Sequence, residues 1–348
     1  MIDVLVVDDS ALMRRFLGQI FTDVGGFNVR LARNGAAALE AMAEQLPDVV
    51  TLDINMPEMD GLTCLSHIMT RHPCPVIMVS SLTEKGALST LEALELGAVD
   101  YLTKPGGTVS HNISQVADEL VAKVRSAASS AVRIRPQITP VAAPAAKPAP
   151  QSAEKAAAGL VLVGVSTGGP GALETVLADL PADLGWPVVI AQHMPATFTA
   201  VLAKRLNGLC VLNVQEVSRP TPLKTGNIYM AQGDRDLEIR RRGGRLIAVP
   251  VPADNDLPWH PSTDRLVRSA MAELTPDALV GVLLTGMGDD GAAAMAELHR
   301  QGGQTVAESE DTTVVFGMPR ALIELDGADR VLPLEQIGRQ VAQWVPSR

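Results

Sequence analysis

Short apolar runs, each ending in a polar residue and followed by a helical pattern, recur along this chain of 348 residues and constrain its fold more than any other feature. One example is Leu160–Val165, which breaks at Ser166 into the glycine-rich turn Thr167–Gly171. Buried strands that alternate with helices predict parallel, doubly wound sheets. The carboxyl ends of such strands meet in one crevice, so the polar residues at those ends are the first candidates for function.

The first part of the chain, residues 1–125, is predicted to form one such α/β domain. Its expected strands are Val4–Val7, Val29–Ala32, Val49–Leu52, Val76–Val79 and Ala98–Leu102. The residues that end four of these strands are Asp8, Asp9, Asp53, Ser80 and Lys104. Crowded carboxylates repel one another unless a hard cation lies among them, and Mg²⁺ takes oxygen ligands of this kind.

A metal and Lys104 would neutralise the charge of an incoming phosphoryl group, which Asp53 could accept. Ser80 could hydrogen-bond a phosphoryl oxygen. A single acidic residue at a strand end is common without any such role. The whole set together favours phosphoryl transfer.

Residues 126–158 differ abruptly in composition, being mostly Ala, Pro and Ser, with prolines every four residues from Pro136 to Pro148. Such a segment cannot bury a core, so we interpret it as an extended or disordered linker. Ser126–Val132 could prolong the preceding helix. The linker would let the first domain dock on the second and leave again.

The last part, residues 159–348, is again predicted to be α/β, with a mostly parallel sheet and one antiparallel hairpin that turns through Arg241–Gly244. Three of its strand ends supply Ser166, His193 and the pair Asp289-Asp290. A serine, a histidine and an aspartate gathered in this way could form an acyl-transfer triad.

In such a triad the serine attacks, the histidine takes its proton and the aspartate orients the imidazole. The main chain around Ser166, at Thr167 and Gly168, and around Met287 would offer N–H groups to an oxyanion. The order Ser, His, Asp differs from the Ser, Asp, His order of α/β-hydrolases, so the G-x-S-x-G pattern at Gly164–Gly168 does not indicate that fold.

Each of the three triad positions has an alternative interpretation. The turn after Leu160–Val165 would also suit a phosphate-binding loop. His260 rivals His193 as the base, although no clear strand precedes it. The residues alone do not decide between Asp289 and Asp290.

The first domain resembles the receiver domain of two-component response regulators. The resemblance rests on Asp8-Asp9, Asp53-x-Asn55-Met56-Pro57 with Gly61, Ser80-Ser81 and Lys104-Pro105. It implies a flavodoxin-like fold in which Asp53 accepts a phosphoryl group from a histidine kinase. It also implies that Asn55 adds a main-chain carbonyl to a Mg²⁺ shell of Asp8, Asp9 and Asp53, and that Tyr101 is an aromatic switch residue.

The second domain resembles the catalytic domain of the chemotaxis protein-glutamate methylesterases. The motifs are Gly164-x-Ser166-Thr167-Gly168-Gly169-Pro170, Gln192-His193-Met194, Leu284-Thr285-Gly286-Met287-Gly288-x-Asp290-Gly291 and Phe316-Gly317-Met318-Pro319. The resemblance implies a Rossmann-like domain in which Asp290, rather than Asp289, completes the triad. It further implies hydrolysis of glutamate γ-methyl esters, and deamidation of glutamines, on chemoreceptors without a cofactor in the esterase step.

Net charge and amino-acid composition limit the classes of partner to be expected. The net charge is −10, and the second domain has 16 Lys and Arg against 22 Asp and Glu, so nucleic acid is not expected as a partner. The three cysteines are far apart, which suits a reducing cytosol, and no signal peptide or membrane-inserting segment is expected. We expect a cytoplasmic monomer. The alternative function is a response regulator whose second domain binds DNA or acts as a non-enzymatic interaction module.

Overall fold

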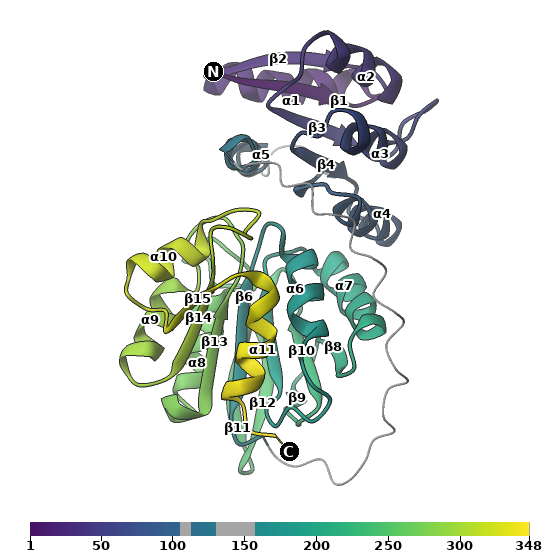
Figure 1. Ribbon diagram of the computed structural model, residues 1–348. Coiled ribbons are helices and arrows are strands. Elements are labelled where there is room, and N and C mark those ends of the chain that lie inside the picture. The colour runs from purple at the N-terminus through teal and green to yellow at the C-terminus, as the bar shows by residue number, and fades with distance from the viewer. Residues whose placement is uncertain (105–112, 130–156, 348) are drawn as a thin grey trace. The chain divides into compact units, whose positions relative to one another are not determined.

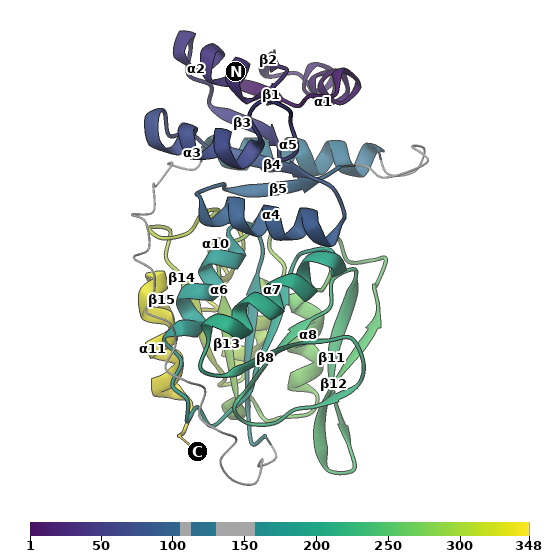
Figure 2. The same cartoon turned by 90° about the vertical axis from the view of Figure 1, so that its right-hand side faces the viewer.

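The computed structural model describes residues 1–104, 113–129 and 157–347 (Figures 1 and 2). Contacts within the chain divide it into two units, Met1–Thr139 and Pro140–Arg348. The expected linker lies mostly outside the described residues. Its first four residues, 126–129, continue the preceding helix, as the sequence suggested for this stretch.

The first unit is a five-stranded parallel sheet, which confirms the predicted doubly wound α/β fold. Its strands are β1 (Ile2–Val7), β2 (Phe27–Ala32), β3 (Val49–Asp53), β4 (Val76–Ser80) and β5 (Asp100–Thr103). Its helices are α1 (Ala11–Val24), α2 (Gly35–Glu44), α3 (Gly61–Arg71), α4 (Glu84–Glu95) and α5 (Ile113–Ser129). The strand order β2-β1-β3-β4-β5 is the flavodoxin-like order, and α1 and α5 pack together while α2, α3 and α4 line the other face.

Local sequence explains where four of these helices begin. The residue before each of α1 to α4 has a side-chain oxygen that accepts a hydrogen bond from a main-chain N–H in the first turn. These capping residues are Ser10, Asn34, Asp60 and Thr83. The caps accept hydrogen bonds from N–H groups that the helix itself leaves unpaired. They therefore define the residue at which each helix begins.

The second unit is built on a seven-stranded parallel sheet in the order β15-β14-β13-β6-β7-β10-β8. The strands are β6 (Leu160–Val165), β7 (Val188–Gln192), β8 (Asn213–Val217), β10 (Asn227–Ala231), β13 (Leu279–Leu283), β14 (Gln304–Glu308) and β15 (Arg330–Leu332). The helices are α6 (Gly169–Ala178), α7 (Ala196–Leu209), α8 (Thr263–Met271), α9 (Ala292–Arg300), α10 (Met318–Glu324) and α11 (Leu334–Trp344), with a 3₁₀ turn at Pro276–Ala278. Helices α6, α7 and α11 pack together on one face, and α8, α9 and α10 on the other (Figure 1).

The strand order reverses at the centre of this sheet. From β6 the chain moves outward through β7 to β8 and β10, then returns to place β13 on the other side of β6. The gap between the two loops that leave β6 and β13 is therefore a topological switch point, where open α/β sheets bind ligands. Both loops carry motifs that the sequence singled out.

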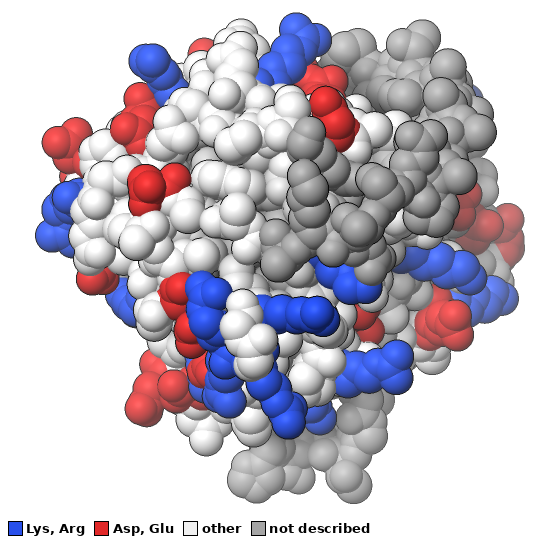
Figure 3. All heavy atoms as spheres, turned by 90° about the horizontal axis from the view of Figure 1, so that it is seen from below, with Lys and Arg blue, Asp and Glu red and all other residues white. Residues whose placement is uncertain are grey.

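The predicted hairpin is present, but it belongs to a separate three-stranded antiparallel sheet of β9 (Thr221–Pro222), β11 (Arg235–Arg242) and β12 (Arg245–Pro252). Its two-residue turn is Gly243-Gly244, with φ of 57° and 77°, which glycine adopts without strain. Exposed arginines flank this turn, and Figure 3 shows Lys and Arg gathered on this face of the molecule. Among the described residues, none of the helices is long and apolar enough to cross a membrane.

Candidate active site

Ser166 lies in the loop that joins β6 to α6, directly at the switch point. Its main-chain N–H donates to the carbonyl of Thr285, in the loop after β13, over 3.0 Å. Its carbonyl accepts hydrogen bonds from the N–H of Gly169 at 2.8 Å and from Nε2 of Gln192 at 3.0 Å. The neighbouring loop approaches closely, because a Cβ added at Gly286 would lie 2.7 Å from the Cβ of Ser166. The serine main chain is therefore held from both adjoining strands.

His193, which follows β7, forms a pair with Asp290, which lies in the loop after β13. The distance between His193 Nε2 and Asp290 Oδ2 is 2.8 Å, and both side chains are largely buried. An ionised carboxylate only accepts hydrogen bonds, so Nε2 carries the proton and the lone pair of the neutral ring lies on Nδ1. Nδ1 is buried and has no hydrogen-bond partner among the described residues. The ring nitrogen available as a base is therefore Nδ1.

Helix α8 supports the charge on Asp290. The carboxylate accepts hydrogen bonds from the main-chain N–H groups of Thr263 at 2.6 Å and Asp264 at 3.1 Å, and from the hydroxyl of Ser262 at 3.0 Å. These donors are the capping residue and the first two residues of the helix, where the macrodipole also favours an anion. Burial raises the pKa of Asp290, but the hydrogen bonds from His193, Thr263 and Asp264 outweigh it and hold the pKa below its ordinary value.

Ser166 and His193 are not joined by a hydrogen bond in the part of the chain that the structure describes. Catalytic hydrogen bonds are often long or poorly aligned before substrate binds, so the absence of this bond does not exclude the pair. Thr167 and Gly168 follow the serine into α6, with Gly168 at φ 78°. Met287 follows Gly286, whose own N–H bonds the carbonyl of Val315. The expected oxyanion donors thus lie on the Ser166 loop itself and on the loop after β13.

His260 and Asp289, the alternatives to His193 and Asp290, lie in different surroundings. His260 directs Nδ1 to Asp236 Oδ1 at 2.9 Å, and Asp236 is fully buried. Asp289 is exposed, whereas Asp290 is 8% exposed and carries the bonds described above. The geometry therefore favours His193 and Asp290 over His260 and Asp289.

Several contacts at this site were not predicted from the sequence. Trp259 stacks on His193, with ring centroids 5.5 Å apart and planes 8° apart. The hydroxyl of Thr285 donates to the carbonyl of Thr167 at 2.9 Å and accepts from the main-chain N–H groups of Val314 at 3.1 Å and Val315 at 2.9 Å. Ser262-Thr263-Asp264 does have a sequence signal, since this is how helices commonly begin, but nothing in it indicates a link to Asp290.

A second cluster lies at the carboxyl end of the first sheet. Lys104 Nζ lies 3.0 Å from Asp8 Oδ2 and 2.8 Å from Asp53 Oδ2. Oxygen atoms of Asp8, Asp9 and Asp53 all lie within 4.8 Å of one another, which suits a hard cation with oxygen ligands. Asp8 and Asp53 are buried, whereas Asp9 is exposed.

Burial raises the pKa of Asp53 despite the opposing effect of Lys104. Burial also lowers the pKa of Lys104, but the two carboxylates outweigh this and the pKa lies above its ordinary value. The hydroxyl of Ser80 is buried and donates to the carbonyl of Gly86 at 3.2 Å. The ring of Tyr101 is buried, with Lys123 Nζ 5.0 Å from its centroid, and the N–H of Asn55 lies 3.4 Å from Asp53 Oδ1.

Comparison with known proteins identifies the family. Residues 161–341 match the family model described as CheB methylesterase, and residues 4–111 match the response regulator receiver domain. The chain is 52% identical to a protein-glutamate methylesterase/protein-glutamine glutaminase of Rhodospirillum rubrum, over 99% of this chain and 96% of the relative. The chain belongs to the CheB methylesterase family.

Other members agree with this assignment. A Vibrio cholerae protein-glutamate methylesterase/protein-glutamine glutaminase is 45% identical over 92% of this CheB-family chain and 90% of its own length. The crystal structure of the Thermotoga maritima CheB methylesterase catalytic domain is 35% identical, with a TM-score of 0.52, and covers 54% of this chain and 100% of that domain. Membership makes the second domain that of a methylesterase, against the alternative of a DNA-binding or non-enzymatic output module.

Proposed function

We propose that this enzyme hydrolyses glutamate γ-methyl esters, and deamidates glutamines, on chemoreceptors, with Ser166 as nucleophile, His193 as base and Asp290 as the orienting carboxylate. The observation that carries this proposal is the 2.8 Å bond between His193 Nε2 and Asp290, formed beside Ser166 at the switch point of the sheet. The relatives' names support the choice of substrate.

The reaction begins when Ser166 Oγ attacks the γ-carbonyl carbon while His193 Nδ1 takes the hydroxyl proton. The carbonyl oxygen becomes an oxyanion, and the imidazolium lies against the ionised Asp290. When the tetrahedral intermediate collapses, methanol leaves with the proton from Nδ1, or ammonia leaves from a glutamine substrate. A glutamyl ester of Ser166 remains.

The second half repeats these steps with water. Nδ1 takes a proton from the water, which attacks the acyl carbon, and the proton returns to Ser166 Oγ as the glutamate carboxylate leaves. We place the oxyanion against main-chain N–H groups of Thr167, Gly168 and Met287. Preorganised donors of this kind are each worth about 10²–10³-fold in kcat.

We further propose that the first domain accepts a phosphoryl group on Asp53 from a histidine kinase. Asp8, Asp9 and Asp53, with the carbonyl of Asn55, would hold Mg²⁺, which supplies charge neutralisation for the incoming phosphoryl group. Lys104 and Ser80 would contact the phosphoryl oxygens, and Tyr101 would respond to them. The cluster of three carboxylates beside Lys104 supports this assignment.

The two activities would be linked through the chain's organisation as residues 1–125, a linker at 126–158 and residues 159–348. We propose that the unphosphorylated first domain covers the crevice at Ser166 and that phosphorylation shifts the population toward an open form. We also propose that the chain works as a monomer in the cytoplasm.

The decisive experiment measures methanol release from a methylated receptor fragment, with and without Mg²⁺ and a small-molecule phosphodonor. We expect release that the phosphodonor increases and that Ser166→Ala abolishes in a folded protein. Unchanged turnover in Ser166→Ala would exclude this serine as nucleophile. Removing residues 1–158 should raise the unstimulated rate, whereas an equal or lower rate would contradict occlusion.

A further inference from the structure

The segment Trp259–Ser262 has no part in the proposed chemistry, yet it contacts both members of the His193–Asp290 pair. The indole of Trp259 stacks on the imidazole of His193, with ring centroids 5.5 Å apart. Three residues later, the hydroxyl of Ser262 donates to Asp290 Oδ1 over 3.0 Å. One short segment therefore limits the movement of the base and of the carboxylate that orients it.

A buried carboxylate, Asp236 at the start of β11, holds this segment in place. Its Oδ1 accepts hydrogen bonds from His260 Nδ1 at 2.9 Å and from the N–H of Ser262 at 2.8 Å. Its Oδ2 accepts from Arg265 Nη1 at 2.9 Å and from the N–H of Asp254 at 3.2 Å. A carboxylate can accept about four hydrogen bonds, so Asp236 is close to fully satisfied.

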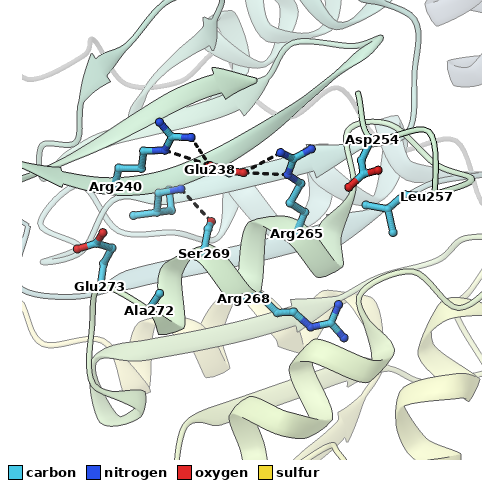
Figure 4. Close-up of a pocket in the computed structure, with 10 residues that line it drawn as sticks. Glu238, Arg240, Asp254, Leu257, Arg265, Arg268, Ser269, Ala272 and Glu273 are labelled. Carbon is cyan, nitrogen blue, oxygen red and sulfur yellow. Dashed lines mark hydrogen bonds and ion pairs between the residues drawn. The ribbon is translucent and has the colours of Figure 1, made fainter. Parts of the chain in front are cut away.

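The network continues outward and fixes Asp236 to the hairpin and to α8. Arg265 also bonds Glu238 through Nε at 2.9 Å, and Glu238 in turn accepts from Arg240 Nη2 at 2.7 Å. Figure 4 shows both arginines converging on Glu238, between the hairpin and the helix. Charge-assisted bonds to planar guanidinium groups restrict the orientation of a carboxylate. The side chain of Asp236 is therefore held between two rigid elements, strand β11 and helix α8.

We propose that Asp236 and His260 are positioning residues for the esterase reaction: they hold Trp259 against His193 and Ser262 against Asp290. Two contacts then limit rotation of the imidazole, the stack on one ring face and the bond at Nε2, so that Nδ1 keeps a single orientation. His260 is an anchor rather than the base. This inference rests on the proposed roles of Ser166, His193 and Asp290.

The test uses two readouts on the full-length chain. The first is the rate at which a fluorophosphonate labels Ser166, which needs no receptor and reports on activation of the nucleophile alone. The second is kcat and KM for methanol release in the presence of phosphodonor. Tryptophan fluorescence melts establish that each variant is folded.

The variants form matched pairs. His260→Asn keeps an amide donor near the position of Nδ1, whereas His260→Phe removes it. Trp259→Phe keeps an aromatic ring for the stack, whereas Trp259→Ala removes it. His299→Phe is the control, because His299 Nδ1 also faces an aspartate, Asp329 Oδ2 at 3.2 Å, without contact to the triad.

We expect His260→Phe and Trp259→Ala to lower the labelling rate and kcat about 10- to 100-fold with KM changed less than about 2-fold, since small misplacements of reacting groups have effects of this size. The conservative partners should recover most of the rate, and His299→Phe should match the wild type. Wild-type labelling rates in His260→Phe and Trp259→Ala, or an equal loss in His299→Phe, would overturn the proposal. Labelling that follows the expected pattern without any methanol release would instead refute only the proposed substrate.

Discussion

Asp290 lies between two sets of donors, the imidazole of His193 and the first turn of α8. The helix donors keep the carboxylate ionised, and the carboxylate determines which ring nitrogen carries the proton. The orientation of the imidazole differs from that in chymotrypsin, in which Nδ1 faces the aspartate and Nε2 faces the serine. In this chain Nε2 faces the aspartate, so the proposed proton transfer from Ser166 would use Nδ1.

Asp290→Asn should therefore disturb the tautomer more than the geometry. An amide can donate to Nε2 and so favours a proton on Nδ1, which then cannot accept the serine proton. We expect kcat to fall about 10⁴-fold, as for the equivalent change in a serine protease. Nitrogen-15 NMR of the histidine ring should show the proton on Nε2 in the wild type at neutral pH. A proton found on Nδ1 in the wild type would contradict the assignment.

The same residue predicts a pH dependence of stability. The pKa of Asp290 is lower in the folded protein than the value of about 3.9 expected when unfolded, so the unfolded state binds the proton more readily. The stabilising contribution is complete above that value and is lost as the pH falls through the folded pKa.

Urea unfolding can measure this effect in the full chain, because all three tryptophans, Trp186, Trp259 and Trp344, lie in the second unit. The difference in unfolding free energy between wild type and Asp290→Asn should be constant near neutral pH and shrink below about pH 4. A difference that does not change with pH would show that the carboxylate charge contributes nothing.

At the scale of elements, the loop after β13 must approach the loop after β6 closely. An added Cβ at Gly286 would lie 2.3 Å from Met318 Sδ and 2.7 Å from Ser166 Cβ. The glycine is needed for this close approach rather than for its φ angle.

Gly286→Ala should displace Ser166 and lower kcat about 10²-fold, since a shift of about 1 Å can have this effect. Gly208→Ala is the control. Gly208 is exposed near the end of α7 with nothing within 4 Å of an added Cβ, so the change should not destabilise the protein and should leave kcat unaltered. Full activity in Gly286→Ala would show that the loop can relax without moving the serine.

At the scale of the whole molecule, each unit has its own sheet and its own buried core, so each should unfold as a separate cooperative transition. Calorimetry of the full chain should resolve two transitions, only one of which tryptophan fluorescence follows. Mg²⁺ with a small-molecule phosphodonor should raise the midpoint temperature of the transition that fluorescence does not follow, because a ligand stabilises the unit that binds it. A single transition seen by both methods would contradict independent units.

Much of this architecture was predictable because strand and helix periodicities are local. The apolar runs around Val4–Val7 and Leu160–Val165, the alternation with helices and the glycine-rich hairpin turn all predicted elements that the structure contains. The short strands β9 and β15 and the helix α10 were not predicted, since each is too short for its period to stand out. Strand ends in parallel sheets lie at one edge, so candidates such as Ser166 and His193 could also be identified.

Contacts between distant segments could not be inferred in this way. Nothing in the sequence around Trp259–Ser262 indicates that the indole reaches His193, that Asp236 anchors the segment, or that the start of α8 surrounds Asp290. Nor does the sequence determine which nitrogen of His193 faces the carboxylate. Residue types and their spacing indicate what chemistry is present, but orientation depends on side chains from β11, α8 and the loop after β13, which come together only when the sheet and its covering helices have packed.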